Sequence, residues 1–194
     1  MNYFKLMQTK KPYAVQNNNL PTYLQNKAGK LCFQFNQLNP NRRKKQKKIL
    51  QKLFGNFNKL VFIKPTFHCD YGFNIHFHGF CVMNYNCSIL DTSPVNIGNG
   101  VFIAPETCLA CSSHAINPKQ RTSGIGQSAP ITIENNVWLG AHCTVLAGVN
   151  IGKNSVIGAN SLVNKNIPEN VIAVGSPCKV LRKITNQDKI KLTL

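Results

Sequence analysis

The stretch from Ile133 to Pro168 reads IENNVW LGAHCT VLAGVN IGKNSV IGANSL VNKNIP, which is six blocks of six residues. Every block begins with an aliphatic residue, the second position is often Gly, and the fifth is small or β-branched. The blocks start at Ile133, Leu139, Val145, Ile151, Ile157 and Val163. A period of six fits neither a helix, with about 3.6 residues per turn, nor an alternating strand. It is typical of a parallel β-helix, in which each short strand forms one side of a coil.

The same pattern extends upstream. The blocks IGNGVF, IAPETC and LACSSH begin at Ile97, Ile103 and Leu109, and a looser version begins at Phe77. In such a coil the aliphatic residues point inward and stack, and Gly or Asn near the corners tolerates positive φ. A sandwich of short strands would not hold one phase across six consecutive blocks. We therefore predict an all-β fold, a parallel β-helix over residues 61–176 with coils of about 18 residues.

The phase of the repeat is interrupted between His114 and Pro130. The intervening residues include Pro118, Gly124 and Gly126 and few apolar side chains. This composition predicts a loop at 115–130 that protrudes from the coil. A long loop on a rigid scaffold is a common position for catalytic residues, although a tolerated insertion is the alternative. His114 is the last residue before the loop.

The two ends of the chain differ from the repeat. Residues 1–60 lack the six-residue period, and the run NRRKKQKKILQKLFG at 41–55 has its apolar residues spaced like one face of a helix. We predict a small basic helical cap at residues 1–60, over the open end of the coil. Residues 177–194 form a C-terminal tail that leaves the coil.

The charge is concentrated in the N-terminal part. Residues 1–64 hold 14 Lys or Arg and no Asp or Glu, whereas residues 65–194 hold 9 Lys or Arg and 6 acids. Such a basic segment suits nucleic acid, an anionic membrane surface or phosphorylated ligands. One alternative function is therefore a basic nucleic-acid-binding or membrane-surface-binding module. Against nucleic acid, no aromatic residues interleave with the run at 42–48, and no known binding motif is present.

No apolar run approaches the length of a membrane span, and the first residues do not resemble a signal peptide. We therefore expect a cytoplasmic protein whose eight cysteines are reduced and mostly buried. Cys108 and Cys111 form a CxxC without a second pair, and the spacing of Cys69, His76, His78 and Cys81 matches no zinc site. We expect no metal.

Several segments resemble the hexapeptide-repeat sugar O-acetyltransferases, the family of maltose and galactoside acetyltransferases. The similarity covers roughly residues 28–184. It is carried by CDYGFNIHF at 69–77, VMNYNCSILD at 82–91, SSHAI at 112–116, the repeat at 130–163 and IPENVIAVGSPCKVLRKI at 167–184. The resemblance implies a left-handed β-helix, a homotrimer with active sites between subunits, and acetyl-CoA as donor to a sugar, glycoside or nucleotide-sugar acceptor.

The resemblance makes His114 the catalytic histidine and Asn84 a catalytic and acceptor-binding residue. A neutral imidazole titrates near physiological pH and suits removal of a hydroxyl proton. A polar residue at a coil corner is the alternative for His114. An inactive β-helix that serves as an assembly scaffold is the alternative for the whole chain.

Two carboxylates are candidates for acceptor binding. Asp70 matches an acceptor-binding position of the family, and Asp91 is a second candidate. A carboxylate can accept hydrogen bonds from two sugar hydroxyls. Because buried Asp is uncommon without partners, a structural role in capping a turn is the alternative for both.

The resemblance also implies a coenzyme A path. Trp138 and Ala141 match the stretch beside the thioester arm, with the Ala141 amide as a candidate donor to the developing oxyanion. Further residues match the pantetheine and phosphate path, where Lys and Arg suit phosphates. They are Ala159, Asn164, Lys165, Lys179 and Arg182.

Two departures from the family concern the acceptor. Many relatives carry Glu at the position of Gly126, and an acidic residue is often present where this chain has Asn17 and Asn18. The resemblance therefore leaves the identity of the acceptor open.

Overall fold

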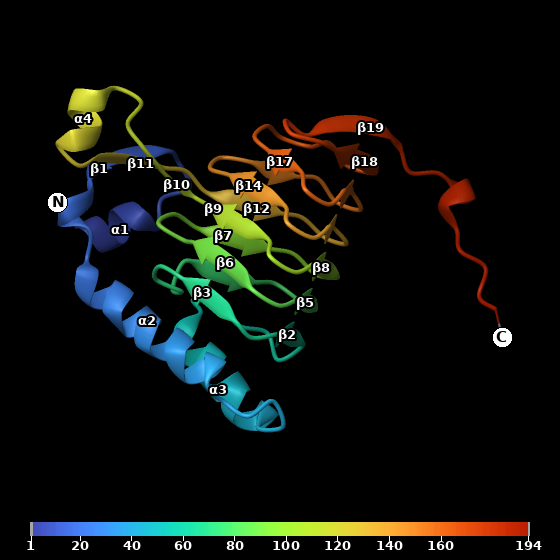
Figure 1. Cartoon of the computed structure of the whole chain (residues 1–194), viewed down its shortest axis with the longest axis horizontal. Helices are drawn as coiled ribbons and strands as arrows, with labels where there is room; N and C mark the ends of the chain where they lie inside the picture. Colours follow the sequence, from blue (N-terminus) through green and yellow to red (C-terminus); the bar gives the residue numbers. More distant parts are fainter. Residues whose placement is uncertain (1, 194) are drawn as a thin grey trace.

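The structure, a computed structural model, describes residues 2–193. Short parallel strands wind into a coil with three faces (Figure 1). Face 1 holds β2 (Val61–Ile63), β5 (Cys81–Met83), β8 (Val101–Ile103), β13 (Trp138–Leu139), β16 (Val156–Ile157) and β18 (Val171–Val174). Face 2 holds β3 (Phe67–Cys69), β6 (Cys87–Leu90), β9 (Cys108–Ala110), β14 (Thr144–Leu146) and β17 (Leu162–Val163). Face 3 holds β4 (Ile75–Phe77), β7 (Val95–Ile97), β12 (Ile131–Ile133) and β15 (Asn150–Ile151).

The aliphatic residues that begin the blocks form the core. Ile97, Ile133 and Ile151 are in register on face 3, and each is at most 1% exposed. On face 1, Ile103 pairs with Leu139, which pairs with Ile157. Each coil is therefore buried by its neighbours, and the predicted β-helix of hexapeptide repeats is confirmed.

The length of a coil changes along the chain. Cys81 pairs with both Val61 and Val101, so the first coils take 20 residues each. Leu139 pairs with Ile157, so the later coil takes the expected 18. The additional residues of the first coils lie at 70–74 and 91–94, between face 2 and face 3. The phase is thus interrupted at these two places as well as at the loop, which the sequence analysis missed.

At the corner from face 3 to face 1, the later coils turn compactly through one residue in the left-handed conformation. Asn136, Asn154 and Asn170 have φ between 58° and 63° at the corner from face 3 to face 1. Their side chains form a ladder, in which the Asn136 amide donates to Asn154 (3.0 Å) and the Asn154 amide donates to Asn170 (2.8 Å). Asn tolerates this conformation better than most residues, and its amide satisfies the next coil.

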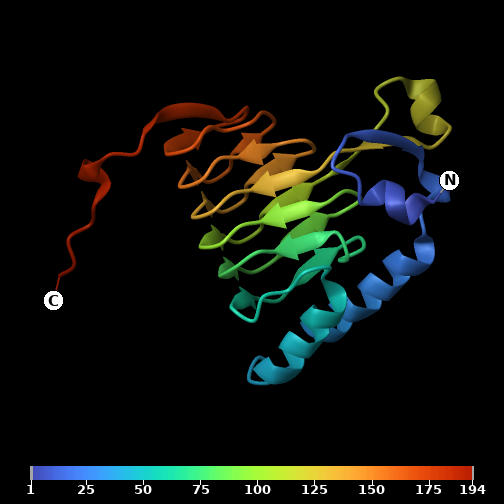
Figure 2. The same ribbon diagram turned by 180° about the vertical axis from the view of Figure 1, so that it is seen from behind.

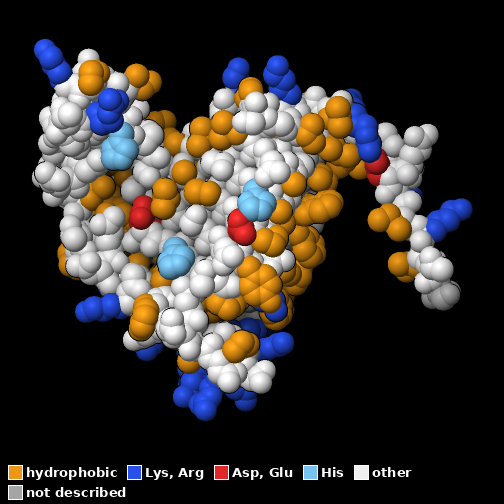
Figure 3. Space-filling model, viewed as in Figure 1, with side chains coloured by type: hydrophobic (Ala, Val, Ile, Leu, Met, Phe, Trp, Pro, Cys, Tyr) orange, Lys and Arg blue, Asp and Glu red, His pale blue; other side chains and the backbone are white. Residues whose placement is uncertain are grey.

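Two helices cover the open end of the coil, α2 (Thr22–Asn36) and α3 (Arg43–Leu53), as Figure 2 shows. Leu50, Leu53 and Phe54 enter the core, and the Phe54 ring packs edge-on against Phe67 and Phe77. The other side of α3 is basic, and Lys and Arg side chains gather at this end of the molecule (Figure 3).

Residues 2–20 do not form part of this helical cap. They comprise α1 (Tyr3–Met7), β1 (Tyr13–Gln16) and η1 (Asn17–Asn19). Strand β1 pairs antiparallel with β11 (Ile125–Ser128), and β11 pairs with β10 (Ser112–His114). The segment 1–60, predicted as a small helical cap, therefore also contains a strand, because Tyr13–Gln16 supplies the outer strand of a small sheet at the loop.

The C-terminal segment stays attached to the coil before it leaves. Strand β19 (Lys179–Lys183) turns back and pairs antiparallel with β18, contrary to the expectation that the chain departs after Pro177. The short helix η2 (Asn186–Asp188) follows, away from the coil (Figure 1). Within residues 2–193, no helix has both the length and the apolar character needed to cross a membrane.

Candidate active site

One corner of the coil differs from the others. We call it the 2–3 corner, the passage from face 2 to face 3, formed by residues 70–74, 91–94 and 111–130 in the first three coils. In the later coils the same passage shrinks to 147–149 and 164–166. Most residues added in the first two coils are buried, whereas Asp70 at this corner is partly exposed and His114 in the loop is exposed.

The loop at 111–130 is folded rather than open. His114 ends β10 opposite Gly126 of β11, and the helix α4 (Pro118–Thr122) connects the two strands. The Asn117 side chain caps α4 by accepting from the Lys119 and Gln120 amides. The Arg121 Nη1 donates to the carbonyls of Ala115 (3.1 Å) and Ile116 (2.9 Å). These contacts fix the strand that carries His114.

A pocket of about 320 Å³ lies at this corner. The loop, the chain start and the expanded corner residues all contribute to its wall. The lining residues are Tyr13, Val15, Asn17, Leu20, Gln25, Asp70, Tyr71, Thr92, Ser112, Ser113, His114, Gly126, Gln127 and Ser128. Among these residues, Asp70 is the one acid and His114 the one imidazole. The structure therefore brings together two of the predicted site residues, His114 and Asp70.

Asp70 and Asp91 occupy different positions. Asp70 is partly exposed to the pocket, and burial raises the pKa of its carboxyl above the ordinary value. Asp91 is fully buried and accepts from the backbone amides of Tyr71 (2.8 Å) and Asn74 (3.4 Å). Burial raises the pKa of Asp91 to about 7. Its carboxylate holds the corner from behind and does not reach the pocket, which contradicts the expectation that it binds the acceptor.

A hydroxyl cluster fixes the back of the pocket and was not found from the sequence. The Tyr13 hydroxyl donates to the Thr92 carbonyl over 2.6 Å, and the Ser128 hydroxyl lies 2.6 Å from that of Thr92 and 2.7 Å from that of Ser93. Burial raises the pKa of Tyr13. The cluster joins the chain start, the second coil and the loop. No local sequence motif predicts this cluster, because its members come together only through the pairing of β1 with β11.

Gly126 gives space to Asn17. A Cβ added to Gly126 would overlap the Asn17 side-chain oxygen, and the Asn17 backbone amide is fixed by a 2.8 Å hydrogen bond to the Gly124 carbonyl. At this place the pocket wall consists of the Asn17 amide over the bare backbone of Gly126. The departure at residue 17 and the departure at residue 126 are thus one structural feature.

Asn84 does not meet His114 within one chain. It follows β5 at the corner from face 1 to face 2, which we call the 1–2 corner, whereas His114 lies beyond the far end of face 2. The Asn84 side-chain oxygen accepts from the Tyr85 amide over 2.9 Å. Asn84 does not line the 320 Å³ pocket.

The 1–2 corner also holds two of the predicted coenzyme A residues. Ala141 follows β13 and Ala159 follows β16. On either side of Ala141, the amides of Gly140 and His142 donate to the Ile157 and Pro105 carbonyls. Within residues 2–193, the Ala141 amide itself has no recorded acceptor. This N–H is therefore available to a bound molecule.

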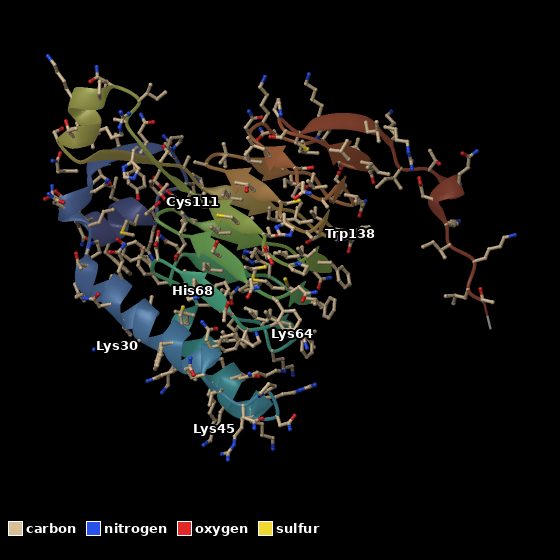
Figure 4. All side chains as sticks on the ribbon, in the orientation of Figure 1. Lys30, Lys45, Lys64, His68, Cys111 and Trp138 are labelled. Atoms are coloured by element: carbon tan, nitrogen blue, oxygen red, sulfur yellow. The ribbon has the colours of Figure 1, made fainter. Side chains whose placement is uncertain are left out.

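Trp138 lies on the outside of face 1 and is 53% exposed, on the side of the coil away from α4 (Figure 4). Its neighbours in register are Phe102 on one side and Val156 on the other, and Phe102 is 48% exposed. Phe62, two strands beyond Phe102, is 44% exposed. Together these side chains form an apolar column along face 1.

The remaining predicted residues are exposed near the C-terminal end of the coil. Asn164 and Lys165 follow β17, and Lys179 begins β19. Arg182, on the same strand, makes a bidentate pair with Asp188, with Nη2–Oδ1 at 2.6 Å and Nη1–Oδ2 at 2.9 Å. Arg182 would have to exchange this exposed partner for a phosphate.

All eight cysteines are free, and six of them are buried. In the part of the chain from residue 2 to 193, no three His, Cys, Asp or Glu side chains are grouped so that they could hold a metal ion.

Comparison with known proteins agrees with this fold. The bacterial transferase hexapeptide family (six repeats) matches residues 130–165, and the maltose acetyltransferase hexapeptide capping motif matches residues 17–58. A galactoside O-acetyltransferase from Escherichia coli is 40% identical over 159 residues, which is 82% of this chain and 78% of that protein.

Two solved structures share the whole fold. The maltose O-acetyltransferase from Clostridium difficile superposes with a TM-score of 0.90 at 36% identity, covering 96% of this chain and 99% of that one. A galactoside acetyltransferase in complex with coenzyme A gives 0.89 at 34% identity, covering 100% and 96%. This chain therefore belongs to the hexapeptide-repeat acetyltransferases of the maltose and galactoside acetyltransferase family.

Proposed function

We propose that the protein transfers an acetyl group from acetyl-CoA to a hydroxyl of a sugar or sugar-like acceptor, with His114 as general base. The observation that carries this proposal is the pocket at the 2–3 corner, where His114 and Asp70 line one polar cavity. The acceptor oxygen attacks the thioester carbon, the C–S bond breaks, and the products are an acetyl ester and free coenzyme A. The hydroxyl proton passes to His114, which returns it to the sulfur of the departing coenzyme A.

His114 suits this role by position. It stands at the end of β10, fixed by its pairing with Gly126, with its side chain exposed at the pocket. A neutral imidazole removes a proton from a weakly nucleophilic hydroxyl as that hydroxyl attacks, and this typically contributes about 10²–10⁴-fold to the rate. Alignment of the two substrates contributes further.

The acceptor faces Asp70 and the amides of Asn17, Gln25 and Gln127. Asp70 accepts hydrogen bonds from acceptor hydroxyls, and the amides both donate and accept. A pocket of about 320 Å³ takes a unit of the size of a single sugar ring.

The donor lies along the 1–2 corner. Coenzyme A is bound in a solved galactoside acetyltransferase that covers the whole of this chain. Here the Ala141 N–H points to the oxyanion that develops on the thioester, with Trp138 beside the thioester arm. Ala159, Asn164, Lys165, Lys179 and Arg182 bind the pantetheine and the phosphates.

The two halves of the site meet between copies of the chain in a homotrimer. His114 and Asn84 lie at different corners, so neither corner is complete alone. The apolar column Phe62–Phe102–Trp138 on face 1 is too exposed for a monomer surface and suits contact with a second copy.

The reaction is tested by following thiol release from acetyl-CoA with galactosides, maltose and nucleotide sugars as acceptors. Acceptor-dependent release, with the acetyl ester found by mass spectrometry, is the expected result. Binding of acetyl-CoA without release for any acceptor would leave the scaffold alternative in place. Absence of acetyl-CoA binding would overturn the proposal.

The shared site is tested by mixing two inactive variants, His114→Ala and Asn84→Ala. Random reassembly should restore about a quarter of the wild-type activity, because each mixed trimer then contains one complete site. Light scattering should give a mass of about three times 21.6 kDa for each variant. Two variants that stay inactive after reassembly, with trimers formed, would place both residues in one subunit's site.

A further inference from the structure

Two thiols from distant parts of the chain lie in contact. Cys32 on α2 and Cys69 on β3 have their sulfur atoms 3.7 Å apart. Cys32 is 2% exposed, whereas Cys69 is partly exposed. The pair connects the cap to the first coil.

The two thiols share a hydrogen bond, which raises the pKa of Cys69 and lowers that of Cys32. Burial adds to the rise at Cys69. The two sulfur atoms are already in contact, so a disulfide can form between them after only a small approach.

The pair lies directly behind the acceptor pocket. Cys69 is followed by Asp70, which lines the pocket, and α2 carries Gln25, which also lines it. Packing of Ala28, Cys32 and Phe35 holds α2 against the coil. A covalent bond between Cys32 and Cys69 would thus join two segments that line one pocket.

We propose that Cys32 and Cys69 form an oxidisable dithiol, which a peroxide converts to a disulfide that locks the cap onto the coil beside the acceptor pocket. One sulfur is oxidised by the peroxide to a sulfenic acid with release of water. The second sulfur attacks it and releases a second water, so that two thiols and one peroxide give one disulfide and two waters. A dithiol reductant reverses the reaction.

The lock should have two consequences. It closes a loop between residues 32 and 69, so the melting temperature should rise by roughly 5–10 °C on oxidation. It also fixes Asp70 relative to Gln25. If the proposed acetyl transfer holds, KM for the acceptor should change on oxidation while KM for acetyl-CoA stays constant.

The full-length protein would be treated with a small excess of hydrogen peroxide and then with N-ethylmaleimide under denaturing conditions. We expect two fewer maleimide adducts than in the reduced protein and a cross-linked peptide that contains Cys32 and Cys69. Dithiothreitol should restore both adducts. This readout does not depend on activity, so its failure is distinct from a failure of the proposed function.

The matched variants are Cys32→Ser, Cys69→Ser and, as a control, the partly exposed Cys108→Ser. The first two should abolish the cross-link and the rise in melting temperature, whereas the control should keep both. A cross-link between other cysteines, or full maleimide labelling of Cys32 and Cys69 after peroxide treatment, would overturn the proposal. The maleimide count and the cross-linked peptide of the wild-type protein test the proposal even where a variant fails to fold.

Discussion

The 2–3 corner of the first coils and the corner from face 3 to face 1 both turn the chain from one face of the coil to the next, but they do so with different residues. The latter is closed by left-handed Asn136, Asn154 and Asn170, whose amides bond from coil to coil. The 2–3 corner contains additional residues, among them His114, Asp70 and the buried Asp91. The regular corner uses its polar side chains to join successive coils, whereas the expanded corner also leaves Asp70 and His114 open at a pocket.

The largest expected effect is on kcat, and it should distinguish two exposed histidines of the coil. His114→Ala should lower kcat by about 10²–10⁴-fold, because it removes the proposed base. His78→Ala, at the corner from face 3 to face 1, removes an exposed imidazole whose ring contacts Asn96 at 3.2 Å. It should leave kcat within about twofold, as expected for a residue outside the chemistry. Equal losses in both variants would remove the distinction between the corners.

The second prediction concerns Asp91, which supports the expanded corner. Burial raises its pKa from 3.8 to about 7, so the folded state binds a proton more tightly than the unfolded state. Its contribution to stability is then full below about pH 4 and is lost as the pH rises towards 7. Urea unfolding at pH 4.5 and pH 8 should show wild type losing on the order of 2–4 kcal/mol relative to Asp91→Asn.

The comparison with Asp91→Asn cancels the other titrating groups, which both proteins share. A difference between the two proteins that stays constant from pH 4.5 to pH 8 would mean that Asp91 is ionised throughout.

The regular part of this comparison was predictable from the sequence and the expanded part only partly. In the blocks from Ile97 and Ile133 the first of every six residues points inward. Each of these residues is buried by its neighbours in the adjacent coils, so its burial follows from the repeat alone. The expansion at 91–94 was visible as a spacing of eight between Ile89 and Ile97. It was missed because the blocks before Ile97 follow the pattern only loosely, so two additional residues did not stand out as a break in the repeat.

The wall of the pocket could not be predicted from the repeat. The strand at Tyr13–Gln16 pairs with residues more than a hundred positions later, and nothing local specifies that partner. Asp91 matched a plausible binding residue by type, but its burial depends on the turn at Tyr71 and Asn74. The repeat therefore determines where His114 stands, while long-range packing determines what faces it.

The third prediction weakens the regular corner. Asn154→Ala should lower the free energy of unfolding by about 1–2 kcal/mol, because Ala disfavours positive φ and breaks the ladder to Asn136 and Asn170. Asn154→Gly retains the backbone conformation and loses only the ladder, so about half of that loss is expected. Chemical denaturation measures both. Activity should be unchanged, since this corner carries none of the site.

The smallest effect concerns two glycines that differ in what surrounds them. Gly126→Ala should lower stability by about 1 kcal/mol, because its Cβ displaces the Asn17 side chain at the pocket. Gly29→Ala, in the interior of α2 with nothing within 4 Å, should instead raise stability by about 0.5–1 kcal/mol. Denaturation midpoints of the two variants should therefore move in opposite directions.

Asn17→Gly in the background of Gly126→Ala tests the cause of the first loss. If the loss comes from the overlap with Asn17, the second substitution removes most of it, and the two changes are coupled rather than additive. Additive losses would mean that Gly126 is required by its own backbone. In that case Gly126 would not be needed to make room for the Asn17 side chain, and the two departures from the family at the pocket would be independent.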